Sequence, residues 1–207
     1  MSKLILIASG HRKTGAEPVL QRAIASLSGV DRYVHNDVLA EIRRTHRPSA
    51  EMAVSAIVEL WFSDADAALH AVSQLRHSGT PLQALQVLSV GEHVIFDHDA
   101  GTAAVTKRMS LLQRRTDMSP AQFQHYWRSV HAPLAECHRF VSRYVQNHVN
   151  QHGEALGPPS FDGVAEFLIT DLVRIEEDYA SAAGQRMKDD VANFASTVTT
   201  FLVEPRG

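Results

Sequence analysis

Arg32-Tyr33-Val34-His35-Asn36-Asp37-Val38 decides the fold, because this stretch of sequence returns later in the chain. At an offset of 111 the sequence is Arg143-Tyr144-Val145-Gln146-Asn147-His148-Val149, with five of the seven positions identical. A second stretch, residues 56–64, is matched by residues 163–171 at an offset of 107. Two matches in the same order, at nearly one offset of about half the chain, predict two copies of one small domain.

Hydrophobic periodicity predicts the same order of elements in both copies: strand, helix, strand, strand, helix, strand. The second copy shows this order most clearly, because Ser119-Pro120-Ala121-Gln122 is a capping box with proline at the first helical position. We expect that helix to stop near Pro133, and a second helix over residues 171–195 to be interrupted near Gly184.

One such unit is a ferredoxin-like antiparallel sheet with both helices on one face. We therefore expect an α+β fold in which two fused ferredoxin-like repeats pack their antiparallel sheets face to face, so that one chain forms a complete two-sheet barrel with the ligand pocket between the sheets. The predicted boundaries are residues 1–98 for the first repeat, 99–106 for the linker and 107–207 for the second repeat.

Composition limits the classes of function. The chain has 207 residues and a net charge of -3, and its basic clusters are short and scattered, which argues against a nucleic-acid binder. The lone Cys137 excludes an internal disulfide, and no apolar run reaches the length of a membrane span. We expect a soluble, cytoplasmic protein that binds neither nucleic acid nor membrane.

The second copy contains five motifs that together resemble the EthD family. They are Lys107–Leu112, Met118–Trp127, His131–Leu134, Arg143–His148 and Phe161–Phe167. That family belongs to the dimeric α/β-barrel superfamily, whose ferredoxin-like units pair through their sheets. The resemblance spans nearly all of residues 105–207, whereas the first copy lacks the Tyr-Trp and His-Ala-Pro motifs and is degenerate. This resemblance implies that the residues of any reactive site come from the second half.

Three side chains of the second copy are candidate catalytic groups: His131, His148 and Tyr144. A histidine near its ordinary pKa can take up and return a proton, and a tyrosine can donate to a developing oxyanion. His131 follows Trp127 by four residues, which places both on the apolar side of the helix. For each histidine the alternative is a structural role, such as capping the helix end.

Further side chains are candidates for binding a substrate: Tyr126, Trp127, Tyr33, His35 and Glu166. Strand alternation puts Tyr33 and His35 in a row that matches Tyr144 and His148, so the two rows would surround one pocket if they face the gap between the sheets. Glu166 and its counterpart Glu59 lie inside apolar strands, where each needs a partner. A salt bridge or a dimer contact explains them as well as a role in the site.

The leading hypothesis is a cofactor-independent lyase (a decarboxylase or dehydratase) or isomerase that moves protons on a small aromatic or polyketide-like substrate. We expect no cofactor and no metal, because the twelve histidines show no metal-binding spacing. The alternatives are a non-catalytic protein that binds a small molecule, and a haem binder with an axial histidine. The sequence leaves open whether the chain forms a homodimer.

Overall fold

The computed structural model of this chain describes residues 1–9, 16–42, 54–77, 85–98, 105–150 and 161–206. The strands in these ranges are β1 Ser2–Ser9, β2 Val30–Ile42, β3 Val54–Phe62, β4 Leu85–Asp97, β5 Thr106–Arg114, β6 Val141–Val149, β7 Gly163–Ile169 and β8 Ala195–Arg206. The helices are α1 Ala16–Ala25, α2 Ala65–His77, α3 Pro120–Tyr126, α4 Ala132–Leu134, α5 Ile175–Ala180 and α6 Ala182–Asp190. Short turns of other helical types cover Trp127–His131 (π) and Ala135–Cys137 and Val191–Asn193 (3₁₀).

The strands form one closed antiparallel barrel in the order β1-β3-β2-β8-β5-β7-β6-β4. This confirms an α+β fold of the expected barrel type, in which the strands of the two halves join into one continuous sheet. β2 is hydrogen-bonded to β8 and β4 to β6, so both edges of each half are paired with the other half. Closure removes the exposed strand edges that two open sheets would leave.

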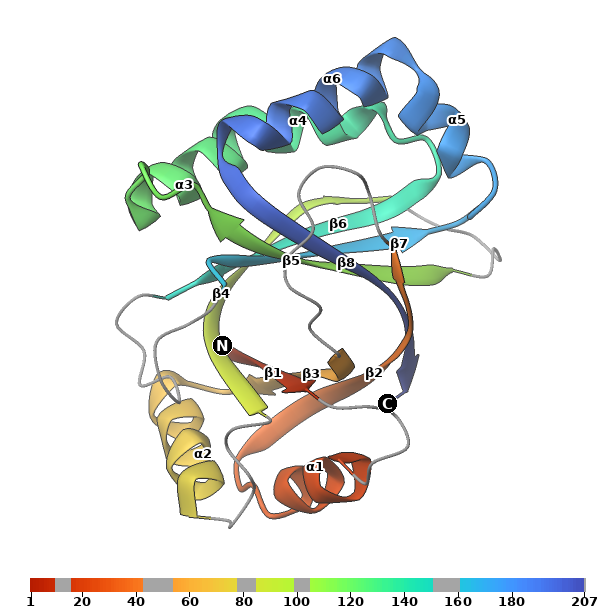
Figure 1. The fold of residues 1–207 in the computed structure, drawn as a ribbon. Helices are drawn as coiled ribbons and strands as arrows, with labels where there is room; N and C mark the ends of the chain where they lie inside the picture. Colours follow the sequence, from red (N-terminus) through yellow and green to blue (C-terminus); the bar gives the residue numbers. More distant parts are fainter. Residues whose placement is uncertain (10–15, 43–53, 78–84, 99–104, 151–160, 207) are drawn as a thin grey trace.

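The helices cover the outside of the barrel in two groups. Figure 1 shows α1 and α2 on one side, and α3, α4, α5 and α6 on the opposite side. Each group packs on apolar residues from the strands of its own half. The barrel therefore has an interior and two separate helix-covered outer faces. None of the helices in the described ranges is long and apolar enough to span a bilayer.

The barrel interior holds a cluster of buried apolar side chains, and the cavity of the second half that is described below lies outside the barrel rather than between the sheets as we expected. One apolar cluster draws buried side chains from all eight strands, among them Ile5, Ile57, Met109 and Phe201. Strand alternation puts the residues two positions away on the same inner face. Among these are the polar side chains Lys3, Asn36, Glu59, Lys107, Asn147 and Glu166.

Those polar side chains form one ion network inside the barrel. Lys3 Nζ lies 2.8 Å from Glu59 and 2.9 Å from Glu166, and Lys107 pairs with the same two carboxylates. Asn36 donates to Glu59 at 2.9 Å, and Asn147 donates to Glu166 at 2.6 Å. Burial alone would raise the pKa of Glu166, but Lys107 and Lys3 outweigh it and hold that pKa well below its ordinary 4.5.

The capping box is confirmed. Ser119 Oγ accepts a hydrogen bond from the Gln122 backbone at 3.2 Å, and the Gln122 side chain accepts one from the Ser119 backbone at 2.8 Å. The helix ends near Pro133, as expected, since α4 ends at Leu134 and a 3₁₀ turn follows. Before its end it widens into a π turn over Trp127–His131, in which the Ala132 N–H donates to the Trp127 carbonyl. This turn buries both Trp127 and His131.

The expected interruption near Gly184 lies three residues earlier, at Ser181. Ser181 Oγ accepts from the Gly184 N–H at 3.0 Å and caps α6, which explains the break. Gly184 has a different role, because a Cβ there would lie 1.9 Å from the Asp178 carbonyl oxygen. It allows α5 and α6 to approach each other.

Candidate functional site

A cavity of about 140 Å³ lies in the second half, between the outer face of the barrel and helices α5 and α6. It is largely apolar, and its polar side chains come from strands on one side and helices on the other. The lining residues are Arg108, Ser110, Leu112, Trp127, His131, Tyr144, Ala165, Phe167, Tyr179, Met187, Lys188, Val191, Phe194, Val198 and Thr200. A mostly apolar cavity with a few convergent polar groups is typical of a small-molecule site.

His131 and Asp190 form a dyad at the wall of this cavity. His131 Nδ1 donates to Asp190 Oδ2 at 2.9 Å, and the imidazole ring packs on Phe194 with ring centroids 4.7 Å apart. Burial lowers the pKa of His131 below its ordinary 6.5, although Asp190 acts in the opposite direction. The ring is therefore neutral at neutral pH. Because Asp190 accepts from Nδ1–H, the other nitrogen, Nε2, carries the basic lone pair.

Asp190 is held in place by other donors. Tyr126 donates its hydroxyl hydrogen to Asp190 Oδ1 at 2.7 Å, and Asn193 donates to the same oxygen at 3.0 Å. Burial opposes ionisation, but the hydrogen bonds from Asn193, Tyr126 and His131 keep the pKa of Asp190 below its ordinary value. An ionised, fixed carboxylate sets the tautomer and the orientation of His131.

Tyr144 presents a hydroxyl group to the same cavity. Its oxygen accepts from Trp127 Nε1 at 3.0 Å and from Gln146 Nε2 at 2.8 Å. Gln146 also donates to the Trp127 carbonyl at 3.0 Å, which fixes the orientation of its amide. With both neighbours donating, Tyr144 keeps its own O–H hydrogen for another acceptor, and the described residues show none. Burial raises the pKa of Tyr144, so the hydroxyl remains a donor.

His148 lies behind Trp127 and does not line this cavity. The two rings stack with centroids 4.8 Å apart, and His148 Nε2 donates to Gln146 Oε1 at 3.0 Å. Burial, followed by His93 and Arg128, lowers the pKa of His148 to about 4. His148 therefore reaches Tyr144 only through Gln146. The structure does not bring His131 and His148 together at one reacting atom.

The expected row from the first half lies elsewhere in the molecule. Tyr33 is 49% exposed, and His35 pairs with Asp37 at 3.2 Å on the outside of the other half of the barrel. The expected single pocket shared by both rows is wrong, because both rows face outward and closure of the barrel separates the two outer faces. Glu166 faces the interior and pairs with lysines, so it lies outside the cavity too.

Of the other predicted residues, Trp127 lines the cavity and Tyr126 supports it through Asp190. Trp127 fits against β7 only because residue 163 is glycine: a Cβ there would lie 2.4 Å from its ring.

The sequence did not mark Arg108, Tyr179 and Asp190 as candidate site residues. Arg108 was recognisable as a charged residue within an apolar strand. Asp190 was not recognisable as a partner of His131, because 59 residues separate the two in the sequence.

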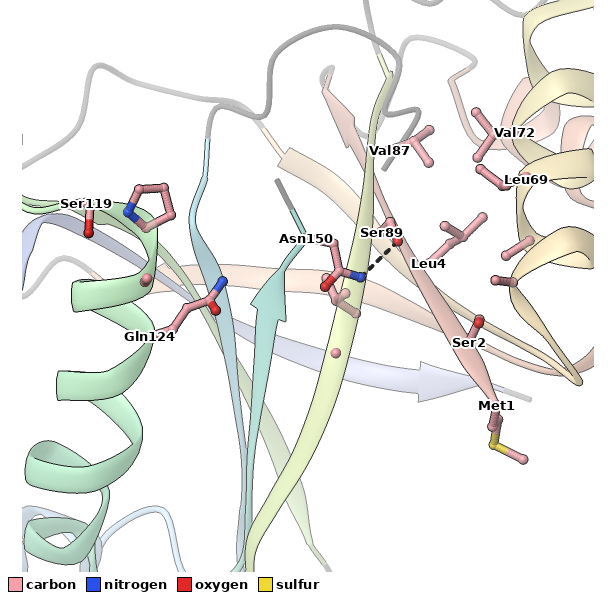
Figure 2. A pocket seen from close by; sticks show the side chains of 16 residues that line it. Met1, Ser2, Leu4, Leu69, Val72, Val87, Ser89, Ser119, Gln124 and Asn150 are labelled. Carbon is pink, nitrogen blue, oxygen red and sulfur yellow. Dashed lines mark hydrogen bonds between the residues drawn. The ribbon is translucent and has the colours of Figure 1, made fainter. Parts of the chain in front are cut away.

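A second, larger groove of about 950 Å³ lies between α2 and the start of α3 (Figure 2). Its wall is mostly apolar, with side chains such as Leu4, Leu69 and Val72. Its polar groups bond to protein, as Asn150 does to Ser89 Oγ at 3.1 Å. No histidine, carboxylate or basic side chain lines it. The smaller cavity is therefore the candidate site, because it alone of the two carries groups that can move a proton.

Comparison with known protein families finds a match within the second half. Residues 115–197 match the EthD domain. The resemblance that the sequence motifs predicted is thus confirmed for this part of the chain. No curated protein matches the sequence.

Solved structures share the fold at low sequence identity. A protein described as anthrone oxidase-like matches with a TM-score of 0.58 at 7% identity, covering 99% of this chain and 92% of its own. Chlorite dismutase from Candidatus Nitrospira defluvii, in complex with imidazole, matches at 0.52 and 10% identity, covering 99% and 91%. A regulator of staphylococcal pathogenesis matches at 0.50 and 10% identity, covering 96% and 97%. The fold is that of the dimeric α/β-barrel proteins. Because these similar structures have such different functions, the fold does not decide this chain's function.

Proposed function

We propose that this chain is an enzyme that moves a proton on a small aromatic or polyketide-like molecule with its own side chains, as a lyase (decarboxylase or dehydratase) or an isomerase. The observation that carries this proposal is the dyad of His131 and Asp190, bonded at 2.9 Å on the wall of a largely apolar cavity. A buried neutral imidazole oriented by a carboxylate is suited to general acid–base catalysis.

The chemistry would run between two sides of the cavity. His131 Nε2 would take a proton from the bound molecule, forming an imidazolium that Asp190 stabilises. Tyr144 would donate its hydroxyl hydrogen to the oxygen on which negative charge develops, as an enolate or phenolate forms. His131 would then return the proton to a leaving oxygen or to a different carbon. The first outcome is a dehydration and the second is an isomerisation. In a decarboxylation, the proton would go to the carbon that has lost carbon dioxide.

The size of the cavity restricts the substrate. A volume of about 140 Å³ is close to the roughly 150 Å³ of a protein cavity that takes up one benzene ring. A substrate with one six-membered ring fits this space, whereas a fused polyketide fits only if the helices move.

Haem, which we considered from the sequence, fits this site in its donor chemistry but not in its size. A histidine with Nδ1 held by a carboxylate is a common metal ligand. However, a haem has four pyrrole rings, and the cavity has room for about one ring. We derive no step through haem. Adding haemin to the purified protein is expected to give no Soret band.

We also propose that the fold arose by fusion of two ferredoxin-like repeats, residues 1–98 and 107–207, joined by a linker over 99–106. The strand order supports this proposal, because β4-β1-β3-β2 in the first half corresponds to β8-β5-β7-β6 in the second. The interior network supports it too, since both halves supply a lysine, an asparagine and a glutamate from corresponding strands, to which the first half adds Glu92, 2.6 Å from Lys3 Nζ.

The test of the enzymatic proposal is a turnover screen without added cofactor. Wild type, His131→Ala and the control His35→Ala are incubated with single-ring aromatic acids, lactones and small polyketide fragments, and followed by chromatography and mass spectrometry. We expect loss of carbon dioxide or water, or a changed retention time at constant mass, with wild type and His35→Ala but not with His131→Ala.

Two results would overturn the proposal. Compounds that stay bound and unchanged with all three proteins would indicate the alternative, a non-catalytic binding protein. A product that gains an oxygen atom would indicate oxygenation, the chemistry suggested by the name of the anthrone oxidase-like structure, and would rule out a lyase or isomerase.

A further inference from the structure

Arg108 brings a positive charge into the cavity wall without an acidic partner. The residue is 8% exposed, and its contacts are aromatic: the guanidinium donates to the Tyr179 hydroxyl and lies 4.6 Å from the Phe167 ring centroid. In the described part of the chain no carboxylate forms an ion pair with it. Burial of an unpaired charge is costly, so buried cations in proteins normally have a counter-ion.

The barrel interior provides an internal comparison. Lys3 and Lys107 are also buried, and each pairs with both Glu59 and Glu166. This protein therefore neutralises its buried cations where no ligand is needed. Arg108 on the cavity wall is the exception.

The other residues that line the cavity also favour an anionic ligand. Lys188 adds a second cation to the wall, and no aspartate or glutamate is among the lining residues. Tyr144 and Arg108 lie against the same ring, since the Tyr144 and Phe167 ring centroids are 4.6 Å apart. The uncommitted hydroxyl hydrogen of Tyr144 and the guanidinium N–H groups thus belong to two side chains that contact one ring of the cavity wall. Both are donors to an anionic oxygen.

We infer that the cavity binds the ionised form of a single-ring aromatic carboxylic acid, whose carboxylate takes hydrogen bonds from Arg108 and Tyr144. This inference rests on the proposed function for its choice of cavity and adds the substrate class. The planar guanidinium offers parallel donors that match the two oxygens of a carboxylate. A phenolate shares the negative charge but presents only one oxygen.

The test is calorimetric titration with three probes that need no turnover: benzoate, the neutral isostere benzamide, and 4-nitrophenolate. We expect benzoate to bind about tenfold or more tightly than benzamide, because a charged hydrogen bond contributes more than a neutral one. We expect Arg108→Gln to lose this preference. Tyr33→Phe, on the exposed face of the other half, should retain it.

Melting temperatures provide a second readout that does not depend on a substrate. Removing an unpaired buried cation relieves a cost, so ligand-free Arg108→Met should melt at or above the wild-type temperature. Benzoate should raise the melting temperature of wild type but not that of Arg108→Met.

Four results would overturn the inference: equal binding of benzoate and benzamide, no binding of benzoate, a preference that survives in Arg108→Gln, or tighter binding of 4-nitrophenolate than of benzoate. These outcomes are independent of catalysis. The proposed function fails separately, if His131→Ala turns over a confirmed substrate as fast as wild type does.

Discussion

The two helix-covered outer faces of the barrel are built from corresponding strands but differ in content. In the first half, Leu4 on β1 lies opposite Leu60 on β3, within an all-apolar cluster under α1 and α2. In the second half, the equivalent cross-strand pair is Arg108 on β5 and Phe167 on β7, at the candidate site. One face serves only packing, and the other carries a base, a cation and a hydroxyl donor.

The interior of the barrel, unlike the two outer faces, has similar content in both halves. There the two halves place the same residue types on corresponding strands, as with Lys3 and Lys107 or Glu59 and Glu166. The inner face must satisfy charges from both halves at once, so a change on one side leaves a buried partner without its counter-ion. The outer faces have no such mutual constraint. The difference indicates that the interior determines the fold, and it is consistent with our proposal that one outer face carries the site.

The largest loss of stability should come from removing one glutamate of the ion network inside the barrel. Glu59→Leu and Glu166→Leu each leave buried lysines short of a counter-ion, which should lower the free energy of unfolding by about 3–5 kcal/mol. Urea denaturation measures both. Because the halves contribute equivalently, the two losses should agree. A loss below about 1 kcal/mol in either variant would contradict a determining role for the network.

The next effect should be confined to the second outer face. Asp190→Asn removes the carboxylate that orients His131, and should lower kcat/KM on a confirmed substrate by about 10²-fold or more. The neighbouring Asp189, which is exposed and bonds only to Gln185 at 2.8 Å, provides the matched control. Asp189→Asn should keep wild-type activity. Equal effects of the two variants would count against the dyad.

A smaller effect should follow from filling the space under Trp127. Gly163→Ala puts a methyl group into the Trp127 ring, and we expect a loss of stability of about 1–3 kcal/mol from overpacking. The variant should also bind benzoate more weakly. Gly91→Ala is the control, since the nearest atom to its added Cβ is 3.8 Å away. Thermal unfolding and titration calorimetry check both variants.

The smallest effect concerns the pH dependence of stability. The pKa of His148 is about 4 in the folded protein against an ordinary 6.5, so the unfolded chain binds more protons between these values. The pKa shift of His148 makes its full contribution to the free energy of unfolding above about pH 6.5. This contribution is lost as the pH falls towards 4. The melting temperature of His148→Gln should therefore fall less steeply over this range. The exposed control His70→Gln should follow wild type.

Much of the fold could be predicted from the sequence, because it depends on local patterns. The repeated Arg-Tyr-Val segment located corresponding strands, and the Ser119–Gln122 box located a helix start that the structure confirms. The barrel was expected from the fusion of two repeats, but which strand face points into it was not predictable in this way. Alternation tells which residues share a face of a strand, but whether that face points inward depends on pairings between distant strands.

This limit explains which site residues the sequence could identify. His131, Trp127 and Tyr144 were candidates because local motifs marked them, and all three line the cavity. Glu166 was a candidate for its unusual position, which has its explanation in the interior network instead. Arg108 could have been found by comparing the two copies, because the matching strand of the first copy has Leu4 at the equivalent place.

The most direct test of the account is nitrogen NMR of the histidine rings during a titration with benzoate. We expect His131 to carry its hydrogen on Nδ1, to titrate below 6.5 and to shift its Nε2 resonance when benzoate binds, while His35 in the other half does not respond. A His131 ring that titrates at or above 6.5, or that ignores benzoate while His35 responds, would contradict the claim that the second outer face is the site.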